Sequence, residues 1–556
     1  MKVTIYSEPK PIRKQNDLCL YIDKWCLIVK DQRSIDGIYS YETVDKICLI
    51  EGSIRIKDSL KEKYSNPAEL YLREYSQIPE AFLYISQGSF IVVEYDKKTC
   101  EIILQRDILG LKHAYYTKTS YGFCFSTSVS PLLEFRNGNN NINFQSLSYY
   151  LSFQYIPQPH SFFTEIKQLP LHGFIKYCNK HISEKLYDGS YSEVLMRHSA
   201  ETSEDLGELL AESMNSQLIK GNNKVGAFLS GGMDTSSNVA ILKSFLNIDP
   251  VVFTAGFKEQ KYDETSYAKI VANTYGLRHH TFTITADVIS SISDICALYD
   301  NPLADRAILP EYLICLKARE EGITQMVTGE GGDEVLGYPR NLPENIKLSQ
   351  KFYENDNNLA YFYNEFSALL KKDIVFEIMQ KSYLSSLDYL HDLYRDSPEL
   401  HPFEKIYYGQ WQMWMIDNVY MKDIQLFSHA GMGFISPYLD IALMKSFIRL
   451  DPQQKIDKLK NKKYLKKTMK EILPLKILNK VKHKFHVPIA EWLRKEIYEQ
   501  VYEELSAKSS ITSQYLNKKL VLQMLDKHKK GENDYNRPLW ALFFLEQWYR
   551  LKKSYM

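Results

Sequence analysis

The sequence lacks any apolar run that approaches the roughly twenty residues a membrane-spanning helix needs. Residues 1–6 continue into Ser7-Glu8-Pro9-Lys10 instead of the apolar core of a signal peptide. The eight cysteines form no CxxC pair and show no spacing typical of a disulfide framework or a zinc site. These absences argue against a secreted, disulfide-stapled or membrane-spanning protein. We expect a cytoplasmic protein with reduced thiols.

A surplus of charge of either sign is also lacking. The chain carries 69 basic and 68 acidic residues among 556, so no net field attracts nucleic acid, and nucleic acid is not expected as a partner. A membrane is not expected as a partner either, because no apolar run is long enough to span one. The length fits two large domains, which we place at residues 1–195 and 196–556. A capping box formed by Thr202 and Asp205 predicts a helix that opens the second domain at Leu206.

The GxxxxGK[ST] motif, whose lysine reaches the terminal phosphates in ordinary NTPases, is absent from the phosphate-binding pattern of this chain. Residues 224–236 instead read Lys-Val-Gly-Ala-Phe-Leu-Ser-Gly-Gly-Met-Asp-Thr-Ser, a short apolar run and a glycine-rich turn before a helical pattern. The glycines let backbone N–H groups face one anion, and the next helix presents its N-terminus there. Ser230, Thr235 and Ser236 add hydroxyl donors. The pattern predicts ATP attacked at its α-phosphate, with pyrophosphate leaving; a plain strand-to-helix turn is the alternative.

A second polar loop, Gly329-Glu330-Gly331-Gly332-Asp333-Glu334, follows another apolar run at residues 324–328. Between the two loops the pattern predicts strands and helices in succession, at residues 251–257, 264–275, 281–284, 286–299 and 308–321. Such a succession forms a parallel sheet whose strands end at one shared edge, so Asp234 and Asp333 can meet although 99 positions separate them. Two carboxylates beside ATP phosphates predict bound Mg²⁺, with a solvated turn as the alternative.

Together these motifs resemble the asparagine synthetase family, an ATP-pyrophosphatase group that also contains β-lactam synthetases and lasso-peptide cyclases. Further matches extend along the chain, at Pro437-Tyr438-Leu439-Asp440, residues 480–488 and residues 539–542. The resemblance implies that Glu330 and Lys482 are catalytic and that Asp234 and Asp333 hold Mg²⁺. It also implies an ATP site that is formed by Leu229, Ser230, Gly231, Gly232, Asp234, Thr235, Ser236, Thr254, Gly256, Gly329 and Gly331.

The front of the chain resembles the glutaminase domain of the same family, but only in its scaffold segments at residues 106–116 and 155–159. The family's nucleophilic cysteine directly after the initiator Met is replaced by Lys2, and the first cysteine is Cys19. A lysine cannot act as that thiolate, so we expect a catalytically inactive domain. The fold class is α/β: an N-terminal Ntn-hydrolase-like α+β sandwich, then a parallel-sheet ATP-pyrophosphatase (PP-loop) domain with a helical C-terminal part.

A run of twelve lysines lies between Lys455 and Lys484. For most of them the helical spacing predicts a solvated helix face. Lys482 differs, because it falls on the family lysine that faces the phosphorus or carbon under attack, where a cation stabilises developing negative charge. Lys484 stands where the family carries glycine, which predicts a different local loop geometry.

The implied reaction adenylates a substrate carboxylate and releases pyrophosphate, after which an amine displaces AMP to form an amide. Glu330 is the expected base for the amine. In β-lactam synthetases the matching position is a tyrosine, which argues against that branch. Where asparagine synthetases carry charged residues ahead of Pro437, this chain has Ile424–Ser428 and Gly433–Ile435.

These replacements weaken a pocket for free aspartate. They favour a specialised amide ligase or lasso-type peptide macrocyclase that does not use glutamine over ammonia-dependent asparagine synthesis, with a non-catalytic nucleotide-binding scaffold as a third hypothesis. The expected partner is a carboxylate-bearing small molecule or a peptide, and a peptide would bring in a partner protein of peptide maturation. The sequence does not indicate an oligomeric state.

Overall fold

The structure is a computed structural model of the 556-residue chain. It describes residues 2–6, 18–22, 25–30, 37–56, 60, 62–119, 122–136, 140–171, 173–187, 205–219, 221, 224–337, 360, 368–395, 405, 408–448, 462–480 and 486–555. The chain forms two compact units. The sandwich unit comprises residues 1–147, 156–191 and 553–556, and the parallel-sheet unit comprises residues 148–155 and 192–552.

The sandwich unit is built from two six-stranded antiparallel sheets. The first has the order β10-β8-β9-β1-β3-β2, with β1 (Lys2–Tyr6), β2 (Leu18–Ile22), β3 (Trp25–Lys30), β8 (Tyr115–Thr119), β9 (Gly122–Ser126) and β10 (Ile166–Gln168). The second has the order β12-β11-β7-β6-β5-β4, with β4 (Gly37–Glu42), β5 (Lys46–Ile56), β6 (Ser86–Asp96), β7 (Glu101–Arg106), β11 (Gly173–Cys178) and β12 (His181–Leu186). The short helices are α2 (Pro67–Leu70), η1 (Tyr71–Tyr75), α3 (Pro79–Ile85), α4 (Ser130–Phe135) and η8 (Lys553–Tyr555), and α5 (Phe144–Phe153) runs from this unit into the other.

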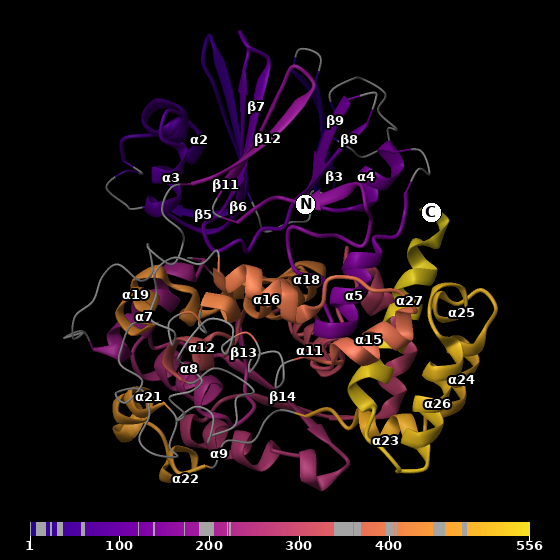
Figure 1. The fold of residues 1–556 in the computed structure, drawn as a ribbon. Helices are drawn as coiled ribbons and strands as arrows, with labels where there is room; N and C mark the ends of the chain where they lie inside the picture. Colours follow the sequence, from indigo (N-terminus) through magenta and orange to yellow (C-terminus); the bar gives the residue numbers. More distant parts are fainter. Residues whose placement is uncertain are drawn as a thin grey trace. The chain divides into compact units, whose positions relative to one another are not determined.

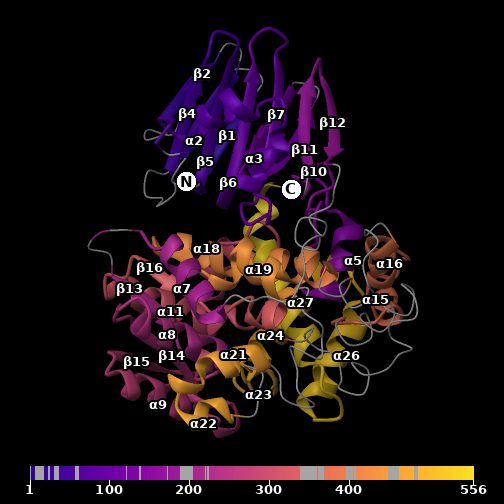
Figure 2. The ribbon, with the colours of Figure 1, turned by 90° about the vertical axis from the view of Figure 1, so that its left-hand side faces the viewer.

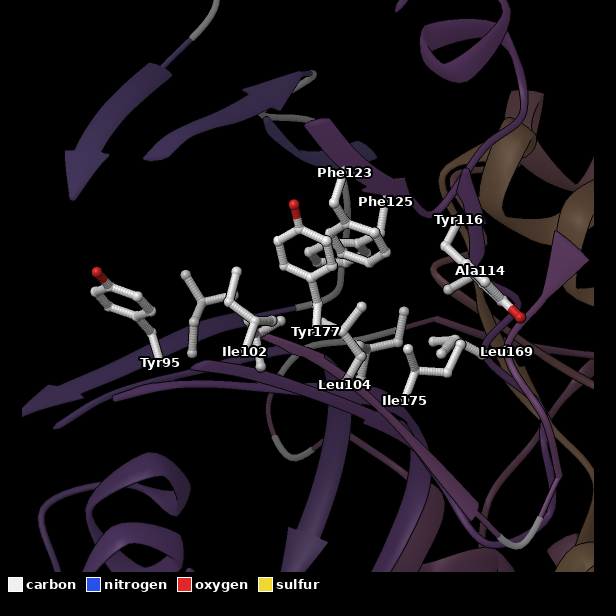
Figure 3. Close-up of a cluster of buried hydrophobic side chains, with 13 residues drawn as sticks. Tyr95, Ile102, Leu104, Ala114, Tyr116, Phe123, Phe125, Leu169, Ile175 and Tyr177 are labelled. Atoms are coloured by element: carbon white, nitrogen blue, oxygen red, sulfur yellow. The ribbon is translucent and has the colours of Figure 1, made fainter. Parts of the chain in front are cut away.

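An apolar core joins the two sheets of the sandwich, as Figure 3 shows. Strand β11 alternates between buried and partly exposed residues, which places Ile175 and Tyr177 on its inner face. Phe123 from the other sheet stacks on Tyr177, with the ring centroids 4.7 Å apart. This arrangement, two sheets whose inner faces share one core, confirms the expected α+β sandwich.

The parallel-sheet unit carries a five-stranded parallel sheet in the order β15-β14-β13-β16-β17. Its strands are β13 (Val225–Phe228), β14 (Val251–Phe257), β15 (His279–Ile284), β16 (Gln325–Val327) and β17 (Gly433–Ile435). The chain builds β13, β14 and β15 in one direction and then returns to add β16 and β17 on the other side of β13. The order therefore reverses between β13 and β16, and in open α/β sheets ligands bind beyond the carboxyl ends of the strands at such a point.

Helices cover both faces of this sheet, with α8 (Met233–Ser244) and α9 (Thr265–Tyr275) on one side and α11 (Ile308–Glu320) and α18 (Met421–Ala430) on the other (Figure 1). Shorter elements of the same region are α7 (Leu206–Gln217), η2 (Gln260–Tyr262), η3 (Ala286–Ser291), α10 (Ile292–Ala297) and α12 (Gly332–Leu336). The following part contains α15 (Lys372–Met379), α16 (Ser386–Arg395), the π-helical η5 (Gln410–Tyr420), η6 (Pro437–Leu439), α19 (Ile441–Ile448), α21 (Lys463–Thr468), η7 (Met469–Glu471) and α22 (Leu475–Leu478).

The C-terminal part of this unit is helical, as expected, with α23 (Ile489–Arg494), α24 (Tyr498–Ser506), α25 (Ile511–Tyr515) and α26 (Lys518–Lys529) gathered about α27 (Asn536–Lys552) (Figures 1 and 2). Helix α27 is buried along most of its length. The indole N–H groups of Trp540 and Trp548 donate to the carbonyls of Ala304 and Tyr299, at 3.0 and 2.9 Å. These two bonds fix the last helix to the segment that leads into α11.

Most of the predicted elements are confirmed, and one detail differs. The predicted strand at residues 251–257 is β14, and the predicted helical stretch 286–299 divides into the 3₁₀ turn η3 and the short helix α10. Helix α7 begins at Leu206 as predicted, with Asp205 as its N-cap: the Asp205 carboxylate accepts the N–H groups of Gly207 and Glu208, and Thr202, the other member of the predicted capping box, lies outside the described residues. A short Asp side chain one residue before the helix satisfies these N–H groups directly. No helix within the described ranges is long and apolar enough to cross a membrane.

Candidate active site

The loop after β13 forms an anion cradle at the start of α8. Gly232 is the N-cap of α8 and offers no side chain to its first N–H groups, so these groups stay available to a bound anion. Inside the loop, Gly232 N donates to Ser230 Oγ at 3.2 Å, and Ser230 N donates to Thr235 Oγ1 at 3.2 Å. Gly231 has φ +69°, and a Cβ there would lie 2.6 Å from the Ala268 nitrogen. Only glycine fits this turn.

The acidic loop after β16 packs directly against the cradle. A Cβ on Gly329 would lie 2.9 Å from Thr235 Cγ2, and one on Gly332 would lie 2.6 Å from Asp234 Oδ1. Gly331 has φ +90°, and it approaches the Tyr420 hydroxyl and Tyr438 in the same way. The glycines therefore allow two loops that are far apart in sequence to touch, as the parallel sheet predicts.

Asp234 and Asp333 converge on a single cation, the ammonium group of Lys462. Its Nζ lies 2.8 Å from Asp333 Oδ1 and donates a hydrogen bond to Asp234 Oδ1. The Lys462 side chain is only 3% exposed. Burial lowers the pKa of Lys462, but the two carboxylates outweigh it and raise the pKa above the ordinary value. The side chain is therefore charged at neutral pH.

This geometry tests whether the carboxylates fit a divalent metal. Both present an oxygen to one positive group, so they can share a cation. Within the described part of the chain no cluster of three or more His, Cys, Asp or Glu side chains is arranged to hold a metal ion. The pair fits Mg²⁺ as two of its ligands, with phosphate oxygens and water completing the octahedral shell that Mg²⁺ prefers.

A second buried lysine closes the other side of the cradle. Lys480 Nζ donates to the carbonyl of Gly231 at 3.2 Å and pairs with Glu264 Oε2 at 3.1 Å. It also lies 4.3 Å from the centre of the Tyr267 ring, which Gly231 approaches. The expectation of a solvated lysine face therefore fails for both Lys462 and Lys480, because their long stems reach into the site from short helices and turns.

Strand β14 supplies the remaining predicted ATP residues. Thr254 Oγ1 donates to the carbonyl of Leu229 at 2.5 Å and shares a 2.8 Å hydrogen bond with His279 Nε2. Burial and the charges of His280 and Lys269 lower the pKa of His279, so this ring is neutral at pH 7. A Cβ on Gly256 would lie 2.6 Å from Asp263 Oδ1. Strand β14 is thus held against Leu229, directly before the glycine-rich loop.

A buried charge cluster lies near Glu330. Lys422 Nζ bonds to Asp423 Oδ1 at 2.5 Å and also to Glu311, and the Lys422 side chain is 2% exposed. Burial, only partly offset by Lys422, raises the pKa of Asp423 to about 6 and raises that of Glu311, with the charge of Glu330 adding to both shifts. The acidic loop is held beside this cluster where Gly331 packs on Tyr420 and where Ser436 Oγ donates to the Glu330 carbonyl at 2.8 Å.

The predicted site is thus brought together at one sheet edge, except for Lys482 and Lys484, which lie outside the described residues. Asp234, Asp333 and the cradle residues meet as expected from the order of strands. Sequence reasoning missed Lys462, Lys422, Glu311 and Asp423. The lysine-rich composition was the only signal for Lys462, and nothing local distinguishes it from its neighbours in the run.

The two units define the class of protein: an Ntn-type sandwich joined to a PP-loop-type domain. Residues 205–550, more than half of the chain, match the family described as asparagine synthase, and the chain belongs to this family. Residues 55–188 match the glutamine amidotransferase domain. The protein is therefore an asparagine synthetase-like carbon–nitrogen ligase of the AMP-forming kind, which makes amides at the expense of ATP.

Several named relatives are similar to this chain at low identity. A glutamine-hydrolyzing asparagine synthetase 1 of Bacillus subtilis is 24% identical over 542 residues, which cover 90% of this chain and 85% of the relative. A relative from Methanocaldococcus jannaschii, also named for asparagine synthetase, is 29% identical over 53% of this chain and 59% of its own. The amidase chry2 of Gibberella zeae is 24% identical over 51% of this chain and 44% of the relative.

Proposed function

We propose that this enzyme adenylates a substrate carboxylate and joins it to an amine that belongs to a substrate, without using glutamine. The observation that carries the proposal is the convergence of Asp234 and Asp333 on one cation at the uncapped N-terminus of α8. A single positive group between two carboxylates, next to free N–H donors, suits the polyphosphate of ATP.

The cradle would bind and orient the nucleotide. N–H groups at the start of α8 and the hydroxyls of Ser230, Thr235 and Ser236 would hold phosphate oxygens. Ser236 Oγ is buried and has no hydrogen-bond partner among the described residues, which leaves it available for this role. Asp234 and Asp333 would hold Mg²⁺, which supplies charge neutralisation on the β- and γ-phosphates. The substrate carboxylate would then attack the α-phosphorus and pyrophosphate would leave.

The second step places the amine opposite the acyl-adenylate. Glu330, which projects from the loop between Gly329 and Gly331, would accept a proton from the attacking amine, and AMP would leave. The family resemblance assigns Lys482 to the negative charge that builds up on phosphorus or carbon. A carboxylate base and a cation would thus act on different parts of the same transition state.

Glutamine is excluded from the proposal by the chemistry of the sandwich unit. Strand β1 reads Lys2-Val3-Thr4-Ile5-Tyr6 and offers no thiol. Cys48 and Cys124 are buried, and burial raises the pKa of both thiols. A nucleophilic cysteine needs the opposite shift, toward the thiolate. We propose that this unit is structural, and that mixing enzyme with glutamine releases no glutamate.

The two segments that replace charged family motifs argue against a pocket for free aspartate. Phe427 and Phe434, from the two segments that replace charged family motifs, stack with centroids 5.7 Å apart, and Ile435 is fully buried. The nearby buried ammonium of Lys422 is already bonded to Glu311 and Asp423, so it does not offer an uncompensated charge to an α-carboxylate. The alternative is ammonia-dependent asparagine synthesis: the names of the relatives support asparagine as the product, and the absence of a cysteine after Met1 leaves ammonia as its nitrogen source.

ATP–pyrophosphate exchange separates these candidates, because it reports adenylation before any amine is needed. The exchange should be dependent on a peptide or other amine-bearing carboxylate substrate and should not respond to aspartate. Peptides encoded beside this gene are the first set to screen. Exchange stimulated by aspartate, followed by asparagine formation from ammonia, would replace the proposal with its alternative. No exchange with any carboxylate, in a protein that binds ATP, would support a non-catalytic scaffold.

A further inference from the structure

The contact between Lys462 and the two carboxylates is more than a structural ion pair, because it occupies the position that a metal would take. Both of its partners are the aspartates that the proposed function assigns to Mg²⁺, and its side chain is 3% exposed. Asp234 is confined from the other side, where a Cβ on Gly332 would come within 2.6 Å of its Oδ1. An ion between the carboxylates and the Lys462 ammonium cannot occupy the same place.

The backbone at Lys462 supports an exchange of partners. The residue has φ 61° and ψ 47°, a left-handed conformation that costs a non-glycine residue on the order of 1 kcal/mol. Lys462 is the N-cap of α21, so the strained residue lies directly before the first turn of this helix. Strain of this kind persists only where surrounding contacts hold it, and here the side chain is anchored by two carboxylates. Releasing that anchor would let the backbone relax.

We propose that Lys462 is the resident counter-ion of the Asp234–Asp333 pair and competes with free divalent metal, so that metal enters this site only together with the nucleotide. The inference rests on the proposed metal site. Its physical basis is charge: two carboxylates and one ammonium leave one net negative charge, too little to strip water from Mg²⁺, which dehydrates reluctantly. Phosphates in the adjacent cradle add negative charge and give the displaced ammonium a new partner.

This arrangement has a functional consequence. An enzyme whose two carboxylates are partly neutralised by its own lysine does not collect free metal, and the contact with Lys462 holds its acidic loop before substrate arrives. Without Lys462, the carboxylates of Asp234 and Asp333 would repel one another and raise the free energy needed to keep the two loops together. Lys462 thus couples metal entry to nucleotide entry, through the exchange of one cation for another.

Manganese binding to the full-length protein tests the inference without reference to activity. Free Mn²⁺ is measured by electron paramagnetic resonance with and without a non-hydrolysable ATP analogue, for the parent protein and for Lys462→Met. The parent should bind one Mn²⁺ only with the analogue. Lys462→Met should bind Mn²⁺ without it, at least about tenfold more tightly than the parent, and should gain thermal stability from Mn²⁺ that the parent does not. Lys463→Met, an exposed neighbour in the same run, is the control and should behave as the parent.

The outcomes separate the inference from the function beneath it. Equal Mn²⁺ affinity of the parent and Lys462→Met without nucleotide, with normal binding when the analogue is present, would overturn the competition and leave the metal site standing. If neither protein bound Mn²⁺ with the analogue, and Asp333→Asn changed nothing, the proposed metal site itself would fail. Should Lys462→Met not fold, Lys462→Gln and the parent's own dependence on nucleotide carry the same test, because a parent that binds Mn²⁺ alone already contradicts the inference.

Discussion

The two units treat their buried charges differently. In the sandwich unit, the Asp107 carboxylate accepts the N–H groups of Phe90, Leu111 and Lys112, at 3.3, 2.9 and 2.8 Å. Lys112 in turn pairs with the buried Glu51 at 2.9 Å. Asp107 and Lys112 lie in a segment that resembles a glutaminase scaffold. Their polar groups are bonded to other parts of the same unit and are not available to a ligand.

In the parallel-sheet unit, the two carboxylates of the site are paired with a side chain, whereas Asp107 accepts backbone N–H groups. The contact that holds Asp234 and Asp333 is to a lysine side chain, which can leave, and the start of α8 carries no side-chain cap. The comparison teaches that the fold uses the polar groups around Asp107, whereas the N–H groups at the start of α8 are left available to a ligand. The following predictions test this contrast, beginning with the largest effect.

Removing the charge of Asp333 should nearly abolish adenylation. Asp333→Asn keeps the shape but removes the charge of one of the two carboxylates proposed to hold Mg²⁺, an effect of several kcal/mol on the transition state under that proposal, so ATP–pyrophosphate exchange should fall at least about a hundredfold. Lys462 keeps Asp234 as a partner, and thermal unfolding of the apo protein should change little. Asp249→Asn, at an exposed carboxylate that pairs with Lys243, is the control. Exchange at the parent rate would reduce the acidic loop to a solvated turn.

Glu330→Gln should separate the half-reactions. Because Glu330 is proposed to act on the amine, exchange should continue near the parent rate, while amide product falls by about a hundredfold or more. Acyl-adenylate would then accumulate or hydrolyse to AMP, which chromatography of quenched reactions detects. For Lys482, the alanine variant Lys482→Ala should lower the rate of adenylation, of amide formation or of both. The variant Lys482→Arg should recover only part of the lost rate. Exchange lost in parallel with product in Glu330→Gln, in a variant that still binds ATP, would leave Glu330 only a positioning role.

How much of this site could be read from the sequence depends on how local each signal is. The cradle and the acidic loop are each one short motif after one strand, and the parallel order of the strands follows from the alternation of apolar and helical patterns. Their meeting was therefore predictable, and the close approach of Gly329 and Gly332 to Thr235 and Asp234 explains it in detail.

The lysine and the charge cluster were not predictable, for a physical reason. Lys462 reaches Asp234 from 228 positions away, and its neighbour Lys463 has the same chemistry but is exposed. Lys422 meets Glu311 across 111 positions, from a different helix. Which lysine of a run turns inward depends on tertiary packing and on a strained backbone conformation, and neither leaves a pattern in the chain.

Lys422→Met should destabilise the parallel-sheet unit by about 3–5 kcal/mol, because it leaves two buried carboxylates without their shared cation. The loss should shrink as pH falls from 7 to 5. Asp423 already has its pKa raised to about 6, and a protonated carboxyl no longer needs a counter-ion. Calorimetry at several pH values measures both effects. The matched control is Lys243→Met, which breaks a surface pair with Asp249 and should cost less than about 1 kcal/mol. A pH-independent loss would show that packing, not charge, is disturbed.

The smallest effect concerns Asp107 in the sandwich unit. Burial raises its pKa to about 6, from an ordinary value of 3.8, although three backbone N–H groups and Arg106 act in the other direction. A raised carboxyl pKa favours the protonated folded state, so its contribution to stability is complete below pH 3.8 and is lost as pH rises through 6. The loss is on the order of 1–3 kcal/mol.

Asp107→Asn removes this proton and also one of the two accepting oxygens, because Oδ1 accepts from Leu111 N and Oδ2 accepts from Phe90 N and Lys112 N; the lost acceptor costs stability equally at every pH, so the comparison with pH still isolates the proton. The stability of Asp107→Asn relative to the parent should therefore improve as pH rises from 4 to 7, measured as the difference between two denaturation series, in which all other titrating groups cancel. Asp96→Asn, at an exposed turn where hydrogen bonds from Lys98 and Thr99 lower the pKa, should shift the other way. Parallel pH curves for the parent and Asp107→Asn would mean that the carboxylate stays ionised, because the N–H groups that it accepts fully balance its charge. The raised pKa of Asp107 would then be wrong, and the contrast between the units would rest on the hydrogen bonds alone.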